Sequence, residues 1–245
     1  LFEHHKNVLE RVVKLYPQAI EDIEPEFGFH FEKQPDSVIA ETVRFTFHKV
    51  LPTKSGIKTD DSLKPVLIIP PFVLGANILA FLPASEKSYT HSFANRSIPT
   101  YIRVMKPIHD SQAVQQMTLE DDARDTRKFC EQLKKLHGHK VTLNGYCQGG
   151  FSSVCNLLSG QLDGLVDALI TCVAPMDGTK SVGLGKFLHD LPDQFNHLDY
   201  GTKTLANGNR IASGELMGWV YKLKSIEDSG PMVAFLRDVM MLSRG

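Results

Sequence analysis

The sequence lacks an excess of either charge. Lysine and arginine number 27 and aspartate and glutamate 28, which gives a formal net charge of -1 over 245 residues. This balance offers no electrostatic reason to expect nucleic acid or an anionic membrane surface as a partner. The most apolar region, residues 65–82, is interrupted by Pro70, Pro71 and Gly75 and is too short and broken to span a bilayer. We therefore expect neither nucleic-acid binding nor a membrane span.

Cysteine is scarce as well. The four cysteines are Cys130, Cys147, Cys155 and Cys172, and their spacing fits neither a zinc site nor a small disulfide scaffold. We expect reduced thiols in a cytoplasmic protein, with no bound metal and no cofactor. Cys130, Cys155 and Cys172 lie on apolar faces of expected helices or strands and are interpreted as core residues.

The composition, 42% hydrophobic and 22% charged, is that of a globular chain long enough for one sizeable core. Apolar spacing divides it into a helical and irregular segment (1–40), a core (41–178) and a helical region (179–245). The helices expected in the outer segments are 4–16, 214–223 and 230–243.

The middle of the chain alternates strands with helices. We expect strands at 41–50, where Val43, Phe45 and Phe47 alternate, and buried strands at 65–69, 98–105, 140–146 and 166–175. Helices are expected at 118–136 and 149–160, which makes the sheet mostly parallel through right-handed crossovers. No strand is expected after residue 175, and residues 181–187 are interpreted as a loop.

One short motif indicates chemistry. Gly145-Tyr146-Cys147-Gln148-Gly149 follows a buried strand and opens a helix, which is the setting of a nucleophile elbow. In such a turn, a side chain at Gly145 or Gly149 would clash with a neighbouring strand or helix. The helix N-terminus favours the thiolate of Cys147. The alternative is a small core cysteine at a strand end.

An acyl-transfer site also needs donors for an oxyanion. The N–H of Gln148, directly after the nucleophile, is the first candidate. A second donor is expected in the turn 68–73, where Pro70 and Pro71 carry no N–H, so that Phe72 supplies the first available one. The alternative is a rigid turn that only ends the strand.

The elbow resembles that of the polyhydroxyalkanoate synthase family, a cysteine-using branch of the α/β-hydrolases. The resemblance extends roughly over residues 40–225, and its motifs are the strand, proline turn and following strand of 65–108, the helix start 118–122, the elbow 141–150 and the strand 166–177. It implies an α/β-hydrolase-like fold with a mostly parallel sheet, followed by the start of a helical cap.

The resemblance also implies an activity. Cys147 would attack a 3-hydroxyacyl-CoA or another acyl thioester and hold the growing polyester as a covalent thioester. A histidine would activate the thiol and an aspartate would orient that histidine. The family further implies a homodimer and a location at the surface of polyester granules.

The triad partners are the open part of this interpretation. Asp177 ends a strand on the correct rim and is the possible acid, with His189 and His197 following it. The alternative makes Asp177 a loop cap and both histidines solvated. His109 and Asp110 precede the nucleophile and are interpreted as loop residues. We expect the triad aspartate and histidine beyond Gly245.

Two other functions remain open. The first is a cysteine α/β-hydrolase, such as a thioesterase, a dienelactone hydrolase or a polyester depolymerase-like enzyme, in which water takes the acyl group. The second is an inactive relative that acts as a partner subunit.

Overall fold

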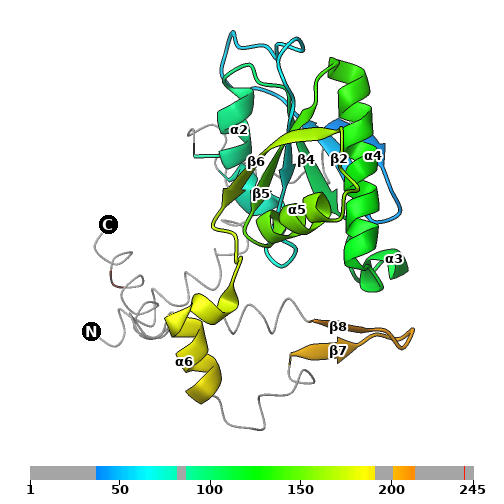
Figure 1. The fold of residues 1–245 in the computed structure, drawn as a ribbon, viewed down its shortest axis with the longest axis vertical. Helices are drawn as coiled ribbons and strands as arrows, with labels where there is room; N and C mark the ends of the chain where they lie inside the picture. The colour runs from blue at the N-terminus through cyan, green and yellow to red at the C-terminus, as the bar shows by residue number, and fades with distance from the viewer. Residues whose placement is uncertain (1–36, 82–86, 191–200, 213–239, 241–245) are drawn as a thin grey trace.

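The sheet at the centre of the chain is mostly parallel. A computed structural model describes residues 37–81, 87–190, 201–212 and Met240. Six strands pair in the order β1-β2-β4-β3-β5-β6 (Figure 1). They are β1 (Val38–Glu41), β2 (Phe45–Val50), β3 (Val66–Ile69), β4 (Thr100–Met105), β5 (Val141–Tyr146) and β6 (Val166–Cys172).

Strand direction confirms the expected α/β class. The pairs β4–β3, β3–β5 and β5–β6 are parallel, whereas β1 and β2 add an antiparallel edge. In register, Ile69 lies opposite Gly145 and Tyr146 lies opposite Cys172. The carboxyl ends of β3, β5 and β6 therefore meet at one rim, where open α/β sheets bind their ligands.

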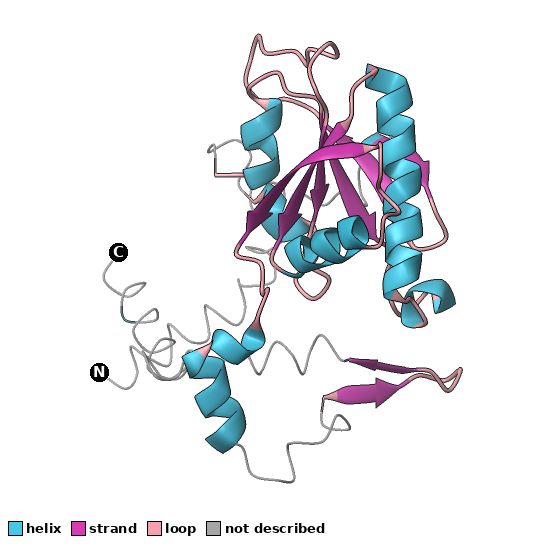
Figure 2. Cartoon of the chain, viewed as in Figure 1, coloured by secondary structure: helices cyan, strands magenta, loops and turns pink. Residues whose placement is uncertain are grey.

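Helices cover both faces of this sheet (Figure 2). One apolar core packs Phe129, Cys130 and Leu133 of α4 against inward residues of the strands. A second core, on the other face, packs Leu79 and Ala94 against the strands. The helical elements are the 3-10 turns η3 (Asn77–Ala80) and η5 (Gly178–Lys180) and the helices α2 (Tyr89–Ala94), α3 (Gln112–Gln115), α4 (Leu119–His137), α5 (Gln148–Leu158) and α6 (Val182–Asp190).

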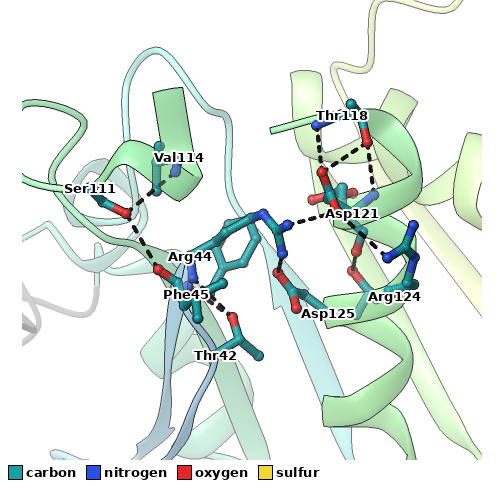
Figure 3. A network of polar contacts seen from close by, with 12 residues as sticks. Thr42, Arg44, Phe45, Ser111, Val114, Thr118, Asp121, Arg124 and Asp125 are labelled. Carbon is teal, nitrogen blue, oxygen red and sulfur yellow. Dashed lines mark hydrogen bonds and ion pairs between the residues drawn. The ribbon is translucent and has the colours of Figure 1, made fainter. Parts of the chain in front are cut away.

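The start of α4 is fixed to the start of β2. Thr118 and Asp121 form a reciprocal capping box, in which each side chain bonds the other residue's backbone N–H. Arg44 then forms ion pairs with Asp121 at 2.7 Å and with Asp125 at 3.0 Å, as Figure 3 shows. These contacts hold the antiparallel edge of the sheet against the helix that packs on the elbow helix.

Two expectations about strands were wrong in detail. Val43 precedes β2 and is 63% exposed, so the buried alternation begins only at Phe45. β6 is only partly buried, because among the described residues it pairs on one side, with β5, and forms an edge. Its apolar sequence is typical of an interior strand, but burial depends on neighbours that the sequence does not show.

Further differences concern the flanking segments. β1 begins at Val38, inside the segment expected to be helical and irregular. Residues 181–187, interpreted as a loop, fall largely within α6. After residue 175 the chain forms a hairpin of β7 (Thr202–Thr204) and β8 (Arg210–Ala212), strands too short for a periodicity to be recognised.

The helices expected at 4–16 and 214–223 lie outside the described residues, as does all but Met240 of the helix expected at 230–243. Within the part of the chain that the structure describes, none of the helices is long and apolar enough to cross a membrane.

Candidate active site

The turn between β5 and α5 holds Cys147 in a strained backbone conformation. Its φ is 54° and its ψ is -123°, which a non-glycine residue rarely adopts. The strain is held by hydrogen bonds: the N–H of Cys147 donates to the Cys172 carbonyl at 2.8 Å, and the N–H of Gly150 donates to the Cys147 carbonyl at 2.9 Å. This is the nucleophile-elbow arrangement, and the expected α/β-hydrolase-like fold is confirmed.

The positions around the elbow are glycines because a larger side chain would not fit there. A Cβ on Gly149 would lie 2.0 Å from the Ile69 carbonyl oxygen, and one on Gly145 would lie 2.4 Å from the Gly150 Cα. A Cβ on Gly150 would meet the Ala174 Cβ at 2.6 Å. The obstacles at Gly145 and Gly149 are backbone atoms, which cannot move aside as a flexible side chain would. Close contact between α5 and the strand ends therefore needs these glycines.

Replacing Gly149 with alanine is expected to lower the free energy of unfolding by about 2–3 kcal/mol, because α5 must move away from β3. Gly178→Ala is the matched control, since a Cβ there has no atom within 4 Å. Urea unfolding of both variants measures the difference. Equal stabilities would contradict the close contact of α5 with β3.

The proline turn after β3 lies against the elbow. The Gln148 side chain accepts a hydrogen bond from the N–H of Val73 at 3.0 Å, which joins the two segments. Among the described residues, no acceptor contacts the N–H of Phe72 or the N–H of Gln148. The proline turn and the elbow, the two segments expected to provide oxyanion donors, therefore each carry one N–H without an acceptor. Val73, the next donor in the turn, already donates to the Gln148 side chain.

A buried polar network lies beneath these two segments, and sequence reasoning missed it. Arg103 of β4 and Asp122 of α4 are each 1% exposed and form an ion pair at 2.6 Å. Asp122 also accepts hydrogen bonds from Ser152 and, at 2.8 Å, from Asn156, both on α5. The Arg103 guanidinium lies 5.9 Å from the centre of the Phe72 ring.

This network connects the helix that carries Gln148 with the turn that carries Phe72. A charged residue in an otherwise apolar strand, Arg103 in residues 98–105, was the available signal. A buried arginine needs a partner, and a carboxylate is the usual one.

Cys172 is not the simple core residue expected from sequence. It is only partly buried, and its Sγ lies 3.0 Å from the Tyr89 hydroxyl. The same hydroxyl donates to Asn144 at 2.9 Å. Burial, followed by the contact with Cys172, raises the pKa of Tyr89 to about 12, so this phenol stays protonated at neutral pH.

The other two cysteines also differ from one another. Cys130 is fully buried, as expected, and burial raises the pKa of its thiol to about 12. Cys155 is only partly buried on α5, because the side of the helix turned away from the sheet stays accessible. Within the described ranges, no cluster of three or more His, Cys, Asp or Glu side chains could hold a metal ion.

Among the residues that the structure describes, no histidine contacts Asp177, the candidate acid. Asp177 is exposed and caps η5, where its carboxylate accepts from the N–H of Thr179 at 3.0 Å and from its hydroxyl at 2.5 Å. His189 is exposed beside Asp190, and His197 lies outside the described residues. His109 and Asp110 are exposed in the loop after β4. No histidine among the described residues bonds to Cys147.

Comparison with known proteins found no matching family model and no matching curated protein. Est1E from Butyrivibrio proteoclasticus is similar at 14% identity, over 74% of this chain and 66% of that one, with a TM-score of 0.41. The mature lipase BlEst2 of Bacillus licheniformis matches at 13% identity over 63% and 60%, also with a TM-score of 0.41. A bacterial heroin esterase matches at 13% identity over 64% and 48%, with the same score. The chain thus spans about half to two thirds of the length of these three proteins.

Proposed function

We propose that this chain carries the nucleophile of a cysteine-dependent acyl-transfer reaction, and that Cys147 is this nucleophile. The observation that carries the proposal is the strained conformation of Cys147 between β5 and α5, held by glycines whose Cβ atoms would clash. Strain of this kind persists only where the surrounding structure enforces it, and it concentrates at functional sites.

The surroundings of Cys147 support the attack on a carbonyl group. Its thiol stands at the N-terminus of the 11-residue helix α5, where free backbone N–H groups and the helix dipole stabilise negative charge that develops on the substrate. The thiolate attacks the carbonyl carbon of a thioester or ester and forms an S–C bond. The N–H groups of Gln148 and Phe72 would then bind the oxyanion of the tetrahedral intermediate. The intermediate collapses to an acyl-cysteine as the bond between the carbonyl carbon and the leaving group breaks, and the leaving thiolate or alkoxide takes a proton from solvent.

The proposed reaction has two forms, a synthase and a hydrolase, which differ in the molecule that accepts the acyl group from Cys147. Sequence resemblance supports a synthase, in which the hydroxyl of a second 3-hydroxyacyl group attacks the acyl-cysteine. The nucleophile elbow on this fold equally supports hydrolysis, in which water is the acceptor. Asp177 is engaged by Thr179 and His189 is exposed, so we assign no general base among the described residues.

The first step can be tested without knowing the acceptor. We would incubate the full chain with butyryl-CoA, 3-hydroxybutyryl-CoA or p-nitrophenyl butyrate and measure its intact mass. We expect one acyl group per chain, and peptide mapping should locate it on Cys147. Absence of both an adduct and any release of CoA or p-nitrophenol with all three reagents, or labelling spread over Cys147 and Cys155 alike, would overturn the proposal and favour the inactive partner subunit.

The products then identify the acceptor. Release of CoA together with insoluble polyester from 3-hydroxybutyryl-CoA would identify a synthase. Release of CoA with free hydroxy acid alone would identify a hydrolase.

A further inference from the structure

The side chain of Gln148 ties the elbow to the proline turn, residues 70–75. Its Oε1 accepts a hydrogen bond from the N–H of Val73 at 3.0 Å. The turn has one other hydrogen bond among the described residues, from the N–H of Gly75 to the carbonyl of Pro71 at 3.1 Å, and this bond only closes the turn on itself. Within the described part of the chain, Gln148 therefore supplies the hydrogen bond that joins the turn to another segment.

The two ends of the turn are held in different ways. The carbonyl oxygen of Pro70 lies 2.7 Å from where a Cβ on Gly149 would stand, so the base of the turn packs closely on α5. Val73 and Leu74, at the tip, are 37% and 48% exposed, so packing restrains them less. The position of the tip therefore depends on the hydrogen bond to Gln148.

The N–H of Phe72 lies between two restraints. The peptide before it follows Pro71, whose ring fixes φ at about -65°. The peptide after it carries the N–H of Val73, and the hydrogen bond to Gln148 restrains the plane of that peptide. A donor that is held in place before the reaction stabilises an oxyanion without a cost of reorganisation. Gln148 thus restrains the turn on the side that proline does not.

The same hydrogen bond separates two neighbouring donors. The N–H of Val73 is occupied, whereas the N–H of Phe72 has no acceptor among the described residues. We infer that the Gln148 side chain is a positioning residue of the site proposed above: it holds the N–H of Phe72 toward the oxyanion and withholds the N–H of Val73 from the substrate. Gln148 then serves the reaction twice, through its own backbone N–H and through its carboxamide. The inference rests on the proposed function.

Gln148→Met tests the carboxamide, because methionine has a similar length, keeps the backbone N–H and offers no oxygen acceptor. The limiting rate of Cys147 acylation in a single turnover, with whichever of the three reagents above reacts, should fall about 10- to 100-fold. The substrate concentration that gives half of this rate should change little, because the donor acts mainly in the transition state. Gln112→Met is the matched control, since Gln112 is exposed on α3 and its side chain has no hydrogen bond among the described residues.

The donor of the same hydrogen bond can be removed separately. Replacing Val73 with 2-hydroxyisovalerate turns the N–H into an ester oxygen and keeps the side chain. The rate should fall as in Gln148→Met, and both changes together should cause no further loss, because they break the same bond. An unchanged rate in the ester protein would mean that the carboxamide does not act through Val73, which would overturn the inference. If Gln148→Met fails to fold, the ester protein decides alone.

A transition-state analogue distinguishes a positioning role from a purely structural one. Cys147 should add to a trifluoromethyl ketone analogue of an acyl-CoA: an S–C bond forms, and the carbonyl oxygen becomes an oxyanion or, after taking a proton from solvent, a hydroxyl. A carbon-13 label at the carbonyl carbon reports the pH at which this hydroxyl ionises. In Gln148→Met this pH should rise by about one unit, which corresponds to a tenfold loss of oxyanion stabilisation. Partial unfolding would lower the amount of adduct but leave this pH unchanged.

The analogue also separates the inference from the proposed function. If the unaltered protein forms the adduct on Cys147 and the ionisation pH is the same in Gln148→Met, the positioning role is overturned and the proposed function stands. If the unaltered protein forms no adduct and is not acylated at Cys147, the proposed function itself is overturned, and the inference with it.

Discussion

Cys147→Ala is expected to abolish acyl-cysteine formation and to lower any CoA release to the background rate, a loss of at least about 10³-fold. No other described group near the elbow offers a nucleophile in the same strained position, since the Cys172 thiol contacts Tyr89 instead. The measurement is the rate of CoA release from 3-hydroxybutyryl-CoA at saturating substrate, combined with the intact mass of the protein.

Two variants control this result. Cys155→Ala removes a partly buried thiol from the same helix and should leave the rate unchanged. Cys147→Ser keeps a nucleophilic atom, but an alcohol ionises far less readily than a thiol, so acylation should persist only at a greatly reduced rate. If Cys147→Ala retained CoA release while Cys155→Ala lost it, the assignment of the nucleophile would be wrong.

The elbow could be predicted because its sequence signature is local. Gly145, Cys147 and Gly149 lie within five consecutive residues. The steric obstacle at Gly145 lies in the same turn, at Gly149 and Gly150, whereas the obstacle at Gly149 is the backbone of Ile69 and Pro70. The direction of the parallel strands follows equally from short apolar runs that alternate with helices. The prediction of the Phe72 turn used a different local fact, namely that proline has no N–H.

The Arg103–Asp122 network could not be predicted in the same way. Its members come from β4, α4 and α5, and each has an ordinary local interpretation: Asp122 is an acid in the first turn of a helix, and Ser152 is a small residue in another. Only the packing of α4 against α5 brings them within hydrogen-bond distance. The partial burial of β6 was not predicted either, because the burial of a strand depends on its neighbours in the sheet and not on its own sequence alone.

The Arg103–Asp122 network connects the two segments that carry the proposed oxyanion donors. Asp122 binds Ser152 and Asn156 on α5, while its partner Arg103 lies 5.9 Å from the centre of the Phe72 ring. The two proposed oxyanion donors, on Gln148 and Phe72, therefore stand on segments that share one buried ion pair. A loss of this pair should change both the stability of the fold and the relative position of the donors.

Asp122→Ala is accordingly expected to lower the free energy of unfolding by about 3–5 kcal/mol, because it leaves the buried charge of Arg103 without its partner. The matched control is Glu131→Ala on the same helix, whose exposed i,i+4 pair with Arg127 should contribute less than about 0.5 kcal/mol. Urea unfolding measures both.

The double variant Arg103→Met/Asp122→Leu separates the worth of the pair from the cost of breaking it. Two apolar side chains replace both charges, so its stability should recover most of what Asp122→Ala loses. Acylation of Cys147 should not recover in parallel, because neither apolar residue can bond Ser152 and Asn156 on the helix that carries Gln148. Equal recovery of stability and acylation would mean that the ion pair supports only the fold. If Asp122→Ala lowered the free energy of unfolding by less than about 1 kcal/mol, the Arg103–Asp122 pair could not be the buried pair described above.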